Sequence, residues 1–352
     1  MNLLITGGAG FIGSSFVRTA LRKGDNVAIL DALTYAGNQE NLAGISDPYK
    51  FIKGNICDQE LVLDILRSES IDAIINFAAE SHVDNSIKGS SVFIDTNIKG
   101  TYSMLEAARK YYNELDSVKK NQFRFIHIST DEVYGDLDLN EDRKFDEKTA
   151  YKPSSPYSAS KAASDLLAIA WHRTYCLPVI VTNCSNNYGP RQFPEKLIPH
   201  MILCALSGKS LPLYGDGKNI RDWIHVEDHC NGIYLALVHG KIGQTYCFGG
   251  NSERSNLELV NYLCELLDEL SPKKSGSYKE QLTFIKDRSG HDRRYAIDDS
   301  KAILELGFKR KYNFEQGLKD TVQWYLTNSK WFTTYVGKQT SAKETIVSKE
   351  KI

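Results

Sequence analysis

The sequence has no excess of charge of either sign. Forty-three Lys and Arg residues oppose 44 Asp and Glu residues, so the formal net charge of the 352-residue chain is −1. A chain with this balance has no general attraction for nucleic acid or for anionic membranes. No apolar run reaches the ~18 residues of a membrane span, and residues 1–5 lack the basic segment that opens a signal peptide. We therefore expect a soluble, cytoplasmic protein that binds neither nucleic acid nor membrane.

The sequence also has no CxxC pair. Its seven cysteines mostly lie in apolar runs, at positions 57, 176, 184, 204, 230, 247 and 264. Such spacing is not that of a zinc site or a disulfide framework, so we expect reduced thiols, a reducing compartment and no metal. Internal repeats and low-complexity blocks are absent as well. At this length the chain can form two lobes or one large domain with a well-buried core.

Short apolar runs alternate with segments of helical periodicity in the first half of the chain. The expected strands are residues 3–6, 26–30, 49–53, 73–77, 123–129 and 179–183. The expected helices between them are residues 11–23, 60–68, 92–111 and 157–175. This alternation predicts an α/β fold with a Rossmann-type, doubly wound parallel sheet, which binds ligands at the carboxyl ends of its strands.

The pattern of apolar and turn-forming residues changes near residue 185. Turn-rich segments then alternate with shorter helical patterns at residues 194–206, 227–238 and 257–270. We expect a first domain over residues 1–185, to which residues 222–250 return, and a smaller mixed α/β lobe over residues 186–337. Residues 116–122 are expected to form a polar connector, and residues 338–352 a loose polar tail.

A glycine-rich turn directly follows the first expected strand. The sequence Thr6-Gly-Gly-Ala-Gly-Phe-Ile-Gly13 contains both GxGxxG and an overlapping GxxGxxG. Glycines there let the backbone approach a pyrophosphate at a helix N-terminus. Asp31 lies 21 residues beyond Gly10, where a carboxylate binds ribose hydroxyls and repels a 2′-phosphate. The pattern favours NAD over NADP, and the context disfavours the alternative of a glycine turn without a ligand.

Tyr157 and Lys161 form a YxxxK pair at the start of a long expected helix. Two other pairs match the pattern, but one lies in an expected strand and the other in a Gly-Asp-Gly turn. Helical spacing places Tyr157 and Lys161 on one face. There an ammonium would lower the pKa of the phenol from ~10 towards neutrality and make it a usable general base. The alternative is a helix-start tyrosine beside a solvated lysine.

Asp131 and Glu132 follow a strongly apolar stretch, directly after Ser129 and Thr130. One interpretation is a solvated turn, because 25% of the chain is charged. The other is a reacting pair, because neighbouring carboxyl groups resist ionising together and can divide into an acid and a base.

Together these motifs resemble the extended short-chain dehydrogenase/reductase family and, within it, the dTDP-D-glucose 4,6-dehydratases. The resemblance is carried by TGGAGFIGS, LTYAGN, AAESHVD, STDEVYGD, SPYSASKA, TNCSNNYGP, FPEKLIP, RDWIHVEDH and GHDRRYAID, between residues 6 and 298. It implies a homodimeric hydro-lyase with a tightly bound, recycled NAD. Such an enzyme converts dTDP-D-glucose to dTDP-4-keto-6-deoxy-D-glucose and water in deoxysugar biosynthesis, for example of dTDP-rhamnose. Oxidation at C4, elimination across C5 and C6, and hydride return to C6 would follow in turn.

The resemblance also implies residue roles. Tyr157 would accept the 4-hydroxyl proton, Thr130 would hydrogen-bond that oxygen, and Lys161 would hold the nicotinamide ribose. Glu132 would remove the C5 proton, and Asp131 would protonate the departing C6 oxygen.

The implied NAD contacts are Gly7, Gly10, Phe11, Ile12, Gly13, Asp31, Ala32, Leu33, Thr34, Asn55, Ile56, Phe77, Ala78, Ala79, Glu80, Ser81, Thr96, Tyr157, Lys161 and Asn187. The implied substrate contacts are Ser81, Thr130, Asn186, Lys196, Leu197, Pro212, Leu213, Tyr214, Arg221, Asn256, Asp287, Arg288, Ser289, Gly290 and His291. Of these, Arg221 is the expected diphosphate contact, because its planar fork suits bidentate binding.

Three residues depart from the pattern of these relatives. Asn55 stands where an Asp usually accepts from the adenine amino group, Asn85 where an Arg is common, and Ser289 where a Pro is usual. Two competing functions share the scaffold. A nucleotide-sugar epimerase or decarboxylase is disfavoured by Asp131, because such relatives usually carry a small or uncharged residue there. A non-enzymatic NAD-binding sensor has no need of the five expected catalytic residues together.

Overall fold

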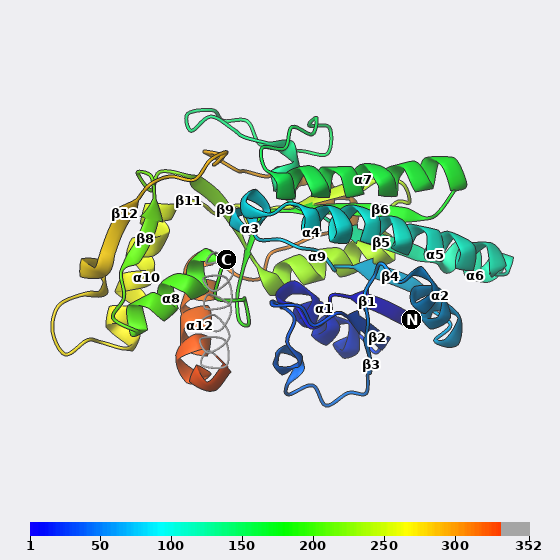
Figure 1. The fold of residues 1–352 in the computed structure, drawn as a ribbon, viewed down its shortest axis with the longest axis horizontal. Coiled ribbons are helices and arrows are strands. Elements are labelled where there is room, and N and C mark those ends of the chain that lie inside the picture. Colours follow the sequence, from blue (N-terminus) through cyan, green and yellow to red (C-terminus); the bar gives the residue numbers. More distant parts are fainter. Residues whose placement is uncertain (332–352) are drawn as a thin grey trace, which may run out of the picture.

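The computed structural model describes residues 1–331, in which a central sheet covered by helices adjoins a smaller lobe (Figure 1). Seven strands form the sheet in the order β10-β6-β5-β4-β1-β2-β3, and every neighbouring pair is parallel. Their bounds are β1 Asn2–Thr6, β2 Asn26–Asp31, β3 Lys50–Lys53, β4 Ala73–Asn76, β5 Arg124–Ile128, β6 Val179–Cys184 and β10 Thr245–Phe248. The expected doubly wound parallel sheet is confirmed. Its strand order reverses between β1 and β4, which is where such sheets bind ligands.

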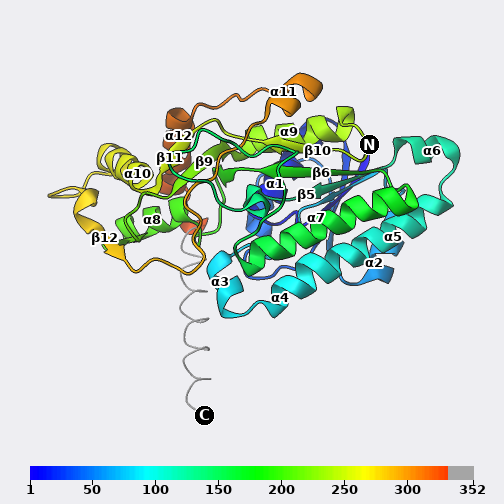
Figure 2. The same ribbon diagram turned by 90° about the horizontal axis from the view of Figure 1, so that it is seen from above.

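Helices cover both faces of this sheet (Figure 2). One face carries α2, α5 and α7, and the other carries α1, α9 and α11. The helices of this part are α1 Phe11–Arg22, α2 Gln59–Ser68, α3 Val83–Lys88, α4 Ser91–Phe93, α5 Thr101–Glu114, α6 Ser117–Gln122, α7 Pro156–Tyr175, α9 Val226–His239 and α11 Ser300–Leu306. The single helix expected over residues 92–111 is interrupted, because a π-helical turn, Ile94–Gly100, separates α4 from α5.

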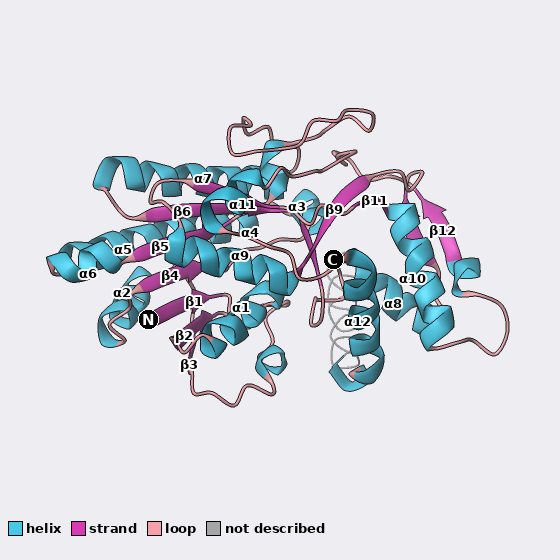
Figure 3. Ribbon diagram, turned by 180° about the vertical axis from the view of Figure 1, so that it is seen from behind, coloured by secondary structure: helices cyan, strands magenta, loops and turns pink. Residues whose placement is uncertain are grey.

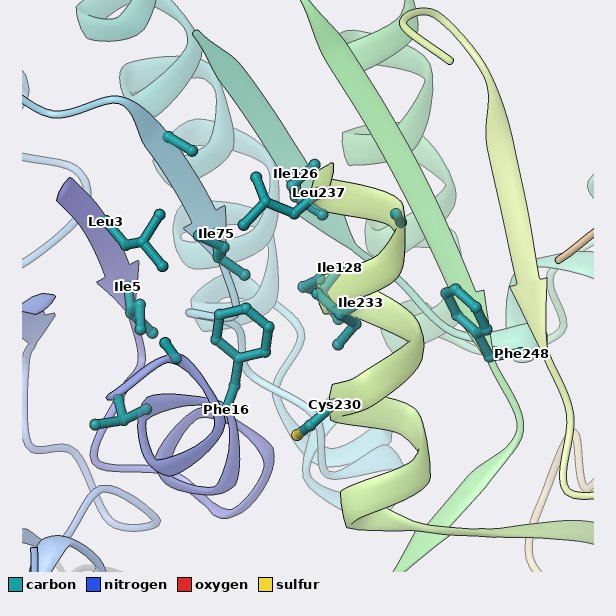
Figure 4. Close-up of a cluster of buried hydrophobic side chains, with 14 of the residues drawn as sticks. Leu3, Ile5, Phe16, Ile75, Ile126, Ile128, Cys230, Ile233, Leu237 and Phe248 are labelled. Atoms are coloured by element: carbon teal, nitrogen blue, oxygen red, sulfur yellow. The ribbon is translucent and has the colours of Figure 1, made fainter. Parts of the chain in front are cut away.

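The core on the α1 and α9 face joins side chains from distant parts of the sequence (Figure 4). Leu3 and Ile5 of β1 and Ile75 of β4 pack with Phe16 of α1 and Ile233 of α9, and all five are at most 1% exposed. Their strands read as nearly continuous apolar runs, as expected for a parallel sheet that is buried on both faces. This packing fixes the carboxyl ends of the strands relative to the N-terminus of α1.

Within residues 1–331, the smaller lobe contains three α-helices and two short sheets (Figure 3). Its helices are α8 Leu197–Leu206, α10 Asn256–Leu270 and α12 Phe314–Thr327. The strands β7 Asn186–Tyr188, β9 Ile220–His225 and β11 Glu253–Ser255 form one sheet in the order β11-β9-β7, and β8 Leu211–Tyr214 pairs with β12 Leu282–Ile285. Both α9 and β10 pack into the central sheet although they come from the second half of the chain. The exact division into domains stays a prediction.

The expected polar connector at residues 116–122 links α5 to β5, and it is helical, because α6 occupies residues 117–122. Asp116 caps this helix by accepting a hydrogen bond from the Lys119 N–H at 2.9 Å. No residue of α6 is buried, so the sequence carries no apolar periodicity that would have indicated a helix. The expected polar tail, residues 338–352, lies outside the described residues. None of the helices within residues 1–331 is long and apolar enough to cross a membrane.

Candidate active site

A cavity of about 320 Å³ opens at the carboxyl ends of the central strands and reaches into the smaller lobe. All of the expected catalytic residues and all of the expected cofactor residues except Leu33 line it. Among the expected substrate residues, Ser81, Thr130, Asn186 and Lys196 line it, whereas Leu197, Pro212, Leu213, Tyr214, Arg221, Asn256 and the segment 287–291 do not. Leu213, at 1% exposed, belongs instead to the core of the smaller lobe.

The glycine turn between β1 and α1 forms one wall of the cavity. Gly7 has a φ of +65°, and a Cβ on it would lie 2.9 Å from the Ala78 nitrogen. A Cβ on Gly13 would lie 2.2 Å from the Gly7 carbonyl oxygen. The first turn of α1 contains no acidic residue, so no side chain of that turn neutralises the positive end of the helix. This wall therefore fits a pyrophosphate.

Asp31 lies at the end of β2 beside this turn. Its two carboxylate oxygens accept hydrogen bonds from the Ala9 N–H at 2.9 Å and the Leu33 N–H at 2.8 Å. These bonds fix the carboxylate while each oxygen keeps a second lone pair for a ligand hydroxyl. Further along the cavity, Asn55 Oδ1 accepts from the Cys57 N–H at 2.9 Å. The amide oxygen that an adenine amino group would use is thus already held in place.

The acid pair lies on a short 3₁₀ helix, Asp131–Tyr134, that directly follows β5. Thr130 caps this helix, because its hydroxyl oxygen accepts from the Glu132 N–H at 3.3 Å. The Thr130 hydroxyl also donates to Asp131 Oδ1 at 3.3 Å. Asp131 is 2% exposed, whereas Glu132 is partly buried. The pair is therefore enclosed in the site, and a solvated turn is excluded.

The two carboxyl groups have different electrostatic surroundings. Burial, then Glu132 and Asp222, hold the pKa of Asp131 well above its ordinary value. Burial also raises the pKa of Glu132, but Lys196, Arg288 and Arg221 oppose that rise. The surroundings therefore favour a protonated Asp131 beside an ionised Glu132.

Tyr157 and Lys161 are buried on the cavity side of α7, at 7% and 4% exposed. Ser155 and Ser158 form a capping box that begins this helix just before Tyr157. The expectation of a Tyr157 pKa lowered towards neutrality is wrong for this structure. Burial and then Glu132 hold that pKa well above its ordinary value, and a hydrogen bond with Thr130 only partly opposes this rise. The Lys161 ammonium donates to the Ile128 carbonyl oxygen at 2.8 Å.

The remaining expected substrate residues lie on several elements of the smaller lobe. Leu197 begins α8, Pro212, Leu213 and Tyr214 lie on β8, Arg221 lies on β9, Asn256 begins α10, and residues 287–291 follow β12. Arg221 is 5% exposed, and it donates to the Asp292 carbonyl at 2.9 Å and the Ile220 carbonyl at 2.7 Å. His291 Nδ1 lies 2.6 Å from Asp287 Oδ1. Lys196 donates to the Ser81 carbonyl at 2.8 Å, which ties the smaller lobe to the loop after β4.

Sequence reasoning missed a second contact between the lobes. The Tyr35 hydroxyl donates to Glu195 Oε1 at 3.3 Å, and the Tyr35 ring meets Phe193 edge-on at 5.6 Å. Glu195 and Phe193 line the cavity. Burial raises the pKa of Glu195 to about 7. Glu195 and Phe193 both lie in the FPEKLIP motif, but no local pattern indicated that this segment would reach Tyr35.

Comparisons with known proteins decide the family. A family model described as GDP-mannose 4,6 dehydratase matches residues 4–321. The dTDP-glucose 4,6-dehydratase 1 of Escherichia coli K12 is 56% identical over 341 residues, which cover 94% of each chain. The chain belongs to the dTDP-glucose 4,6-dehydratase family. The resemblance stated from the motifs is thereby confirmed.

Solved structures agree with this membership. The dTDP-glucose 4,6-dehydratase DesIV of Streptomyces venezuelae, solved with NAD bound, is 47% identical with a TM-score of 0.85. The match covers 94% of this chain and 98% of DesIV. The dTDP-glucose 4,6-dehydratase of Bacillus anthracis in complex with NAD is 46% identical with a TM-score of 0.83, covering 95% of this chain and 99% of the other. Members of the dTDP-glucose 4,6-dehydratase family thus share this fold along almost the whole chain.

Proposed function

We propose that this protein converts dTDP-D-glucose into dTDP-4-keto-6-deoxy-D-glucose and water, as a step in deoxysugar biosynthesis. The observation that carries the proposal is the enclosed carboxyl pair, Asp131 and Glu132, beside Tyr157 in a cavity with a pyrophosphate-binding wall. Family membership supports the same substrate, because the relatives carry it in their names. An enzyme that only epimerised C4 would need no acid for a departing C6 oxygen.

The cofactor would be NAD, held by the glycine wall and by Asp31. The Asp31 carboxylate would accept the adenosine ribose hydroxyls, and its charge would repel the 2′-phosphate of NADP. When bound, NAD would take the hydride from C4 of the sugar and return it at C6, and its positive ring would favour the Tyr157 phenolate. Because the reaction is redox-neutral overall, the cofactor would stay bound from one turnover to the next.

Tyr157 would act as the base for the 4-hydroxyl group. Thr130, whose hydroxyl already contacts the acid pair, would hydrogen-bond the same sugar oxygen. Lys161 would hold the nicotinamide ribose with the N–H groups that it does not donate to Ile128. Oxidation at C4 makes the C5 proton acidic, so the step at Tyr157 must precede elimination.

Glu132 would then remove the C5 proton, and Asp131 would protonate the departing C6 oxygen. The electrostatic surroundings support this division, because the pKa of Asp131 is held well above its ordinary value, whereas three cations oppose the rise in the pKa of Glu132. Asp131 Oδ2 is also buried without a hydrogen-bond partner among the described residues. That oxygen is therefore available to the substrate.

The smaller lobe would bind the nucleotide. Lys196 lines the cavity, and Arg221 on β9 and Arg288 on the loop after β12 oppose the rise in the pKa of Glu132. We assign the diphosphate to Arg221, because a planar guanidinium can bind it bidentately. The remaining expected substrate residues keep the roles given by the resemblance.

The assembly would be a homodimer. Helices and turns around α5 and α7 expose apolar side chains on one side of the sheet, namely Val92, Ile94, Tyr102, Leu166 and Tyr175, each 41–57% exposed. Apolar surface on two adjacent helices suits a four-helix contact between two copies of the chain. A cytoplasmic location is supported by the seven free cysteines, because reduced thiols persist in reducing compartments.

The proposal is tested by incubating the purified protein with dTDP-D-glucose and identifying the product by mass spectrometry and NMR. We expect loss of one water and a 4-keto-6-deoxy sugar without added reductant, and NAD in the supernatant of the denatured protein. An epimerised sugar of unchanged mass, mainly NADP in the supernatant, or a strict need for an external reductant would contradict the proposal.

A further inference from the structure

A buried polar cluster lies beneath the candidate active site, between β5 and α7. At its centre is Asp165, which is 0% exposed and does not line the cavity. Asp165 follows Lys161 by four residues on α7, so the two side chains share one face of the helix. A carboxylate in such a place is tolerated only when hydrogen bonds and an opposite charge compensate its burial.

The hydrogen bonds come from three separate segments. Asp165 Oδ2 accepts from the Ser129 hydroxyl at 2.7 Å, from the Tyr151 hydroxyl at 3.0 Å and from the Asn183 side-chain amide at 3.4 Å. Three donors on one carboxylate oxygen are the pattern of an ionised group, which only accepts. Asp165 Oδ1 lies 3.2 Å from His127 Nε2.

His127 does not supply the opposite charge. It is fully buried, and burial, followed by the charge of Lys161, lowers its pKa, so it is neutral near pH 7. Burial also lowers the pKa of Lys161, but Asp165 is the first group that opposes this effect, and Cys184 is the second. The ammonium and the carboxylate lie beside consecutive residues of one strand end, because Lys161 donates to Ile128 and Asp165 accepts from Ser129.

The same cluster holds the main chain that carries the proposed catalytic threonine. The Asn183 amide that contacts Asp165 also donates to the Thr130 carbonyl oxygen at 3.0 Å. Ser129, the residue before Thr130, is bonded to Asp165 directly. A change at Asp165 would therefore reach both Lys161 and Thr130.

We propose that Asp165 is a positioning residue for the oxidation step, which keeps the Lys161 ammonium charged and fixes the strand end that carries Thr130. It touches neither substrate nor cofactor and acts through these two residues. The inference rests on the roles proposed above for Lys161 and Thr130. Nothing in the YxxxK pattern itself requires an acid four residues after the lysine.

The first test compares the pH dependence of Asp165→Asn with that of the wild type. Removing the negative charge lowers the pKa of Lys161, and a role that needs the ammonium is lost as pH rises through that pKa. In the pH profile of the single-turnover rate of NADH appearance, the alkaline limb of Asp165→Asn should therefore lie about one pH unit or more below that of the wild type. The other titratable groups around the pair, His127, Cys184 and Tyr151, remain in this variant.

Tyr151→Phe is the matched control. It removes one hydrogen bond to Asp165 but keeps the charge, so its alkaline limb should coincide with that of the wild type. The proposal is overturned when Asp165→Asn leaves the limb in place, or when both variants move it equally. An inactive wild type would instead contradict the proposed function.

The second test needs no substrate. Melting temperatures of the protein as isolated are compared for the wild type, Asp165→Asn, Lys161→Met and the double variant. Lys161→Met leaves a buried carboxylate without its opposite charge, so adding Asp165→Asn should recover part of the lost melting temperature. This comparison of the double variant with Lys161→Met stands even when Asp165→Asn alone fails to fold. A double variant that melts below Lys161→Met would show that the two groups are not a charge pair.

Discussion

Replacing Asp131 by Asn should stop elimination while making the folded protein more stable. Burial, Glu132 and Asp222 raise the pKa of Asp131 well above its ordinary value. For an acid whose pKa is raised on folding, the penalty is absent below its unfolded value of about 4 and grows as pH rises towards the folded value. Asn has nearly the same shape and no titration, so the substitution removes this penalty at neutral pH.

The size of the gain follows from the same linkage. Each unit by which folding raises a pKa costs about 1.4 kcal/mol at a pH above both values. A gain of about 1 kcal/mol in the free energy of unfolding raises the melting temperature by roughly 2–4 °C in chains of 150–250 residues. We therefore expect Asp131→Asn to melt ~2 °C or more above the wild type at pH 7, with a smaller difference at pH 5. A positioned general acid contributes ~10²–10⁴ in rate, so product formation should fall by that factor.

The assay separates the steps of the reaction. On mixing with dTDP-D-glucose, Asp131→Asn should give NADH absorbance and measurable exchange of the C5 hydrogen, with little 6-deoxy product. Glu132→Gln should give NADH absorbance with slowed exchange. Tyr157→Phe, the control for the first step, should give no NADH signal. The reasoning is refuted by an Asp131→Asn variant that melts below the wild type at pH 7, or by a double variant of the acid pair that makes product at a near wild-type rate.

Three further predictions concern cofactor, nucleotide and assembly. Gly13→Ala places a Cβ 2.2 Å from the Gly7 carbonyl oxygen, so the purified variant should contain much less NAD per chain. An unchanged NAD content would contradict the proposal that the glycine wall binds the cofactor. Arg221→Ala should raise KM for dTDP-D-glucose more than it lowers kcat, because ~2–4 kcal/mol of binding free energy is lost. An unchanged KM would contradict the assignment of Arg221 to the diphosphate. Leu166, which is 57% exposed, lies in the expected dimer face, so Leu166→Glu places a charge there and light scattering should give the mass of a monomer. Leu304 on α11, which is 83% exposed, lies outside that face, and the control variant Leu304→Glu should stay dimeric.

The parts of the site that could be predicted from sequence are those built by one short segment. The turn from Gly7 to Gly13 is marked by its own glycines, and Asp31 ends the next strand, from where its carboxylate accepts from the Ala9 N–H of that turn. The central sheet was predictable for the same reason, because apolar runs of strand length mark each strand locally. The helical form of the connector α6 could not be predicted, since that helix is held by a local cap and buries no residue.

Contacts between distant segments could not be predicted. The Tyr35–Glu195 hydrogen bond joins residues 160 positions apart, and the Lys196–Ser81 bond joins residues 115 positions apart. Each depends on how the smaller lobe lies against the sheet, which periodicity does not determine. The YxxxK spacing likewise placed Tyr157 and Lys161 on one face correctly, but it carried no information about how far burial would raise the pKa of the phenol.

The acid pair shows how a local motif gains its chemistry from remote residues. Two adjacent carboxyl groups after β5 have no intrinsic reason to differ, and burial raises the pKa of both. Asp131 has Arg221 as the cation that opposes this rise and two acids that strengthen it. Glu132 has Arg221 together with Lys196 and Arg288, each from a different segment of the smaller lobe. The choice of which carboxyl ionises is thus made by the smaller lobe, so a substitution of Lys196 or Arg288 should raise the pKa of Glu132 without touching the motif itself.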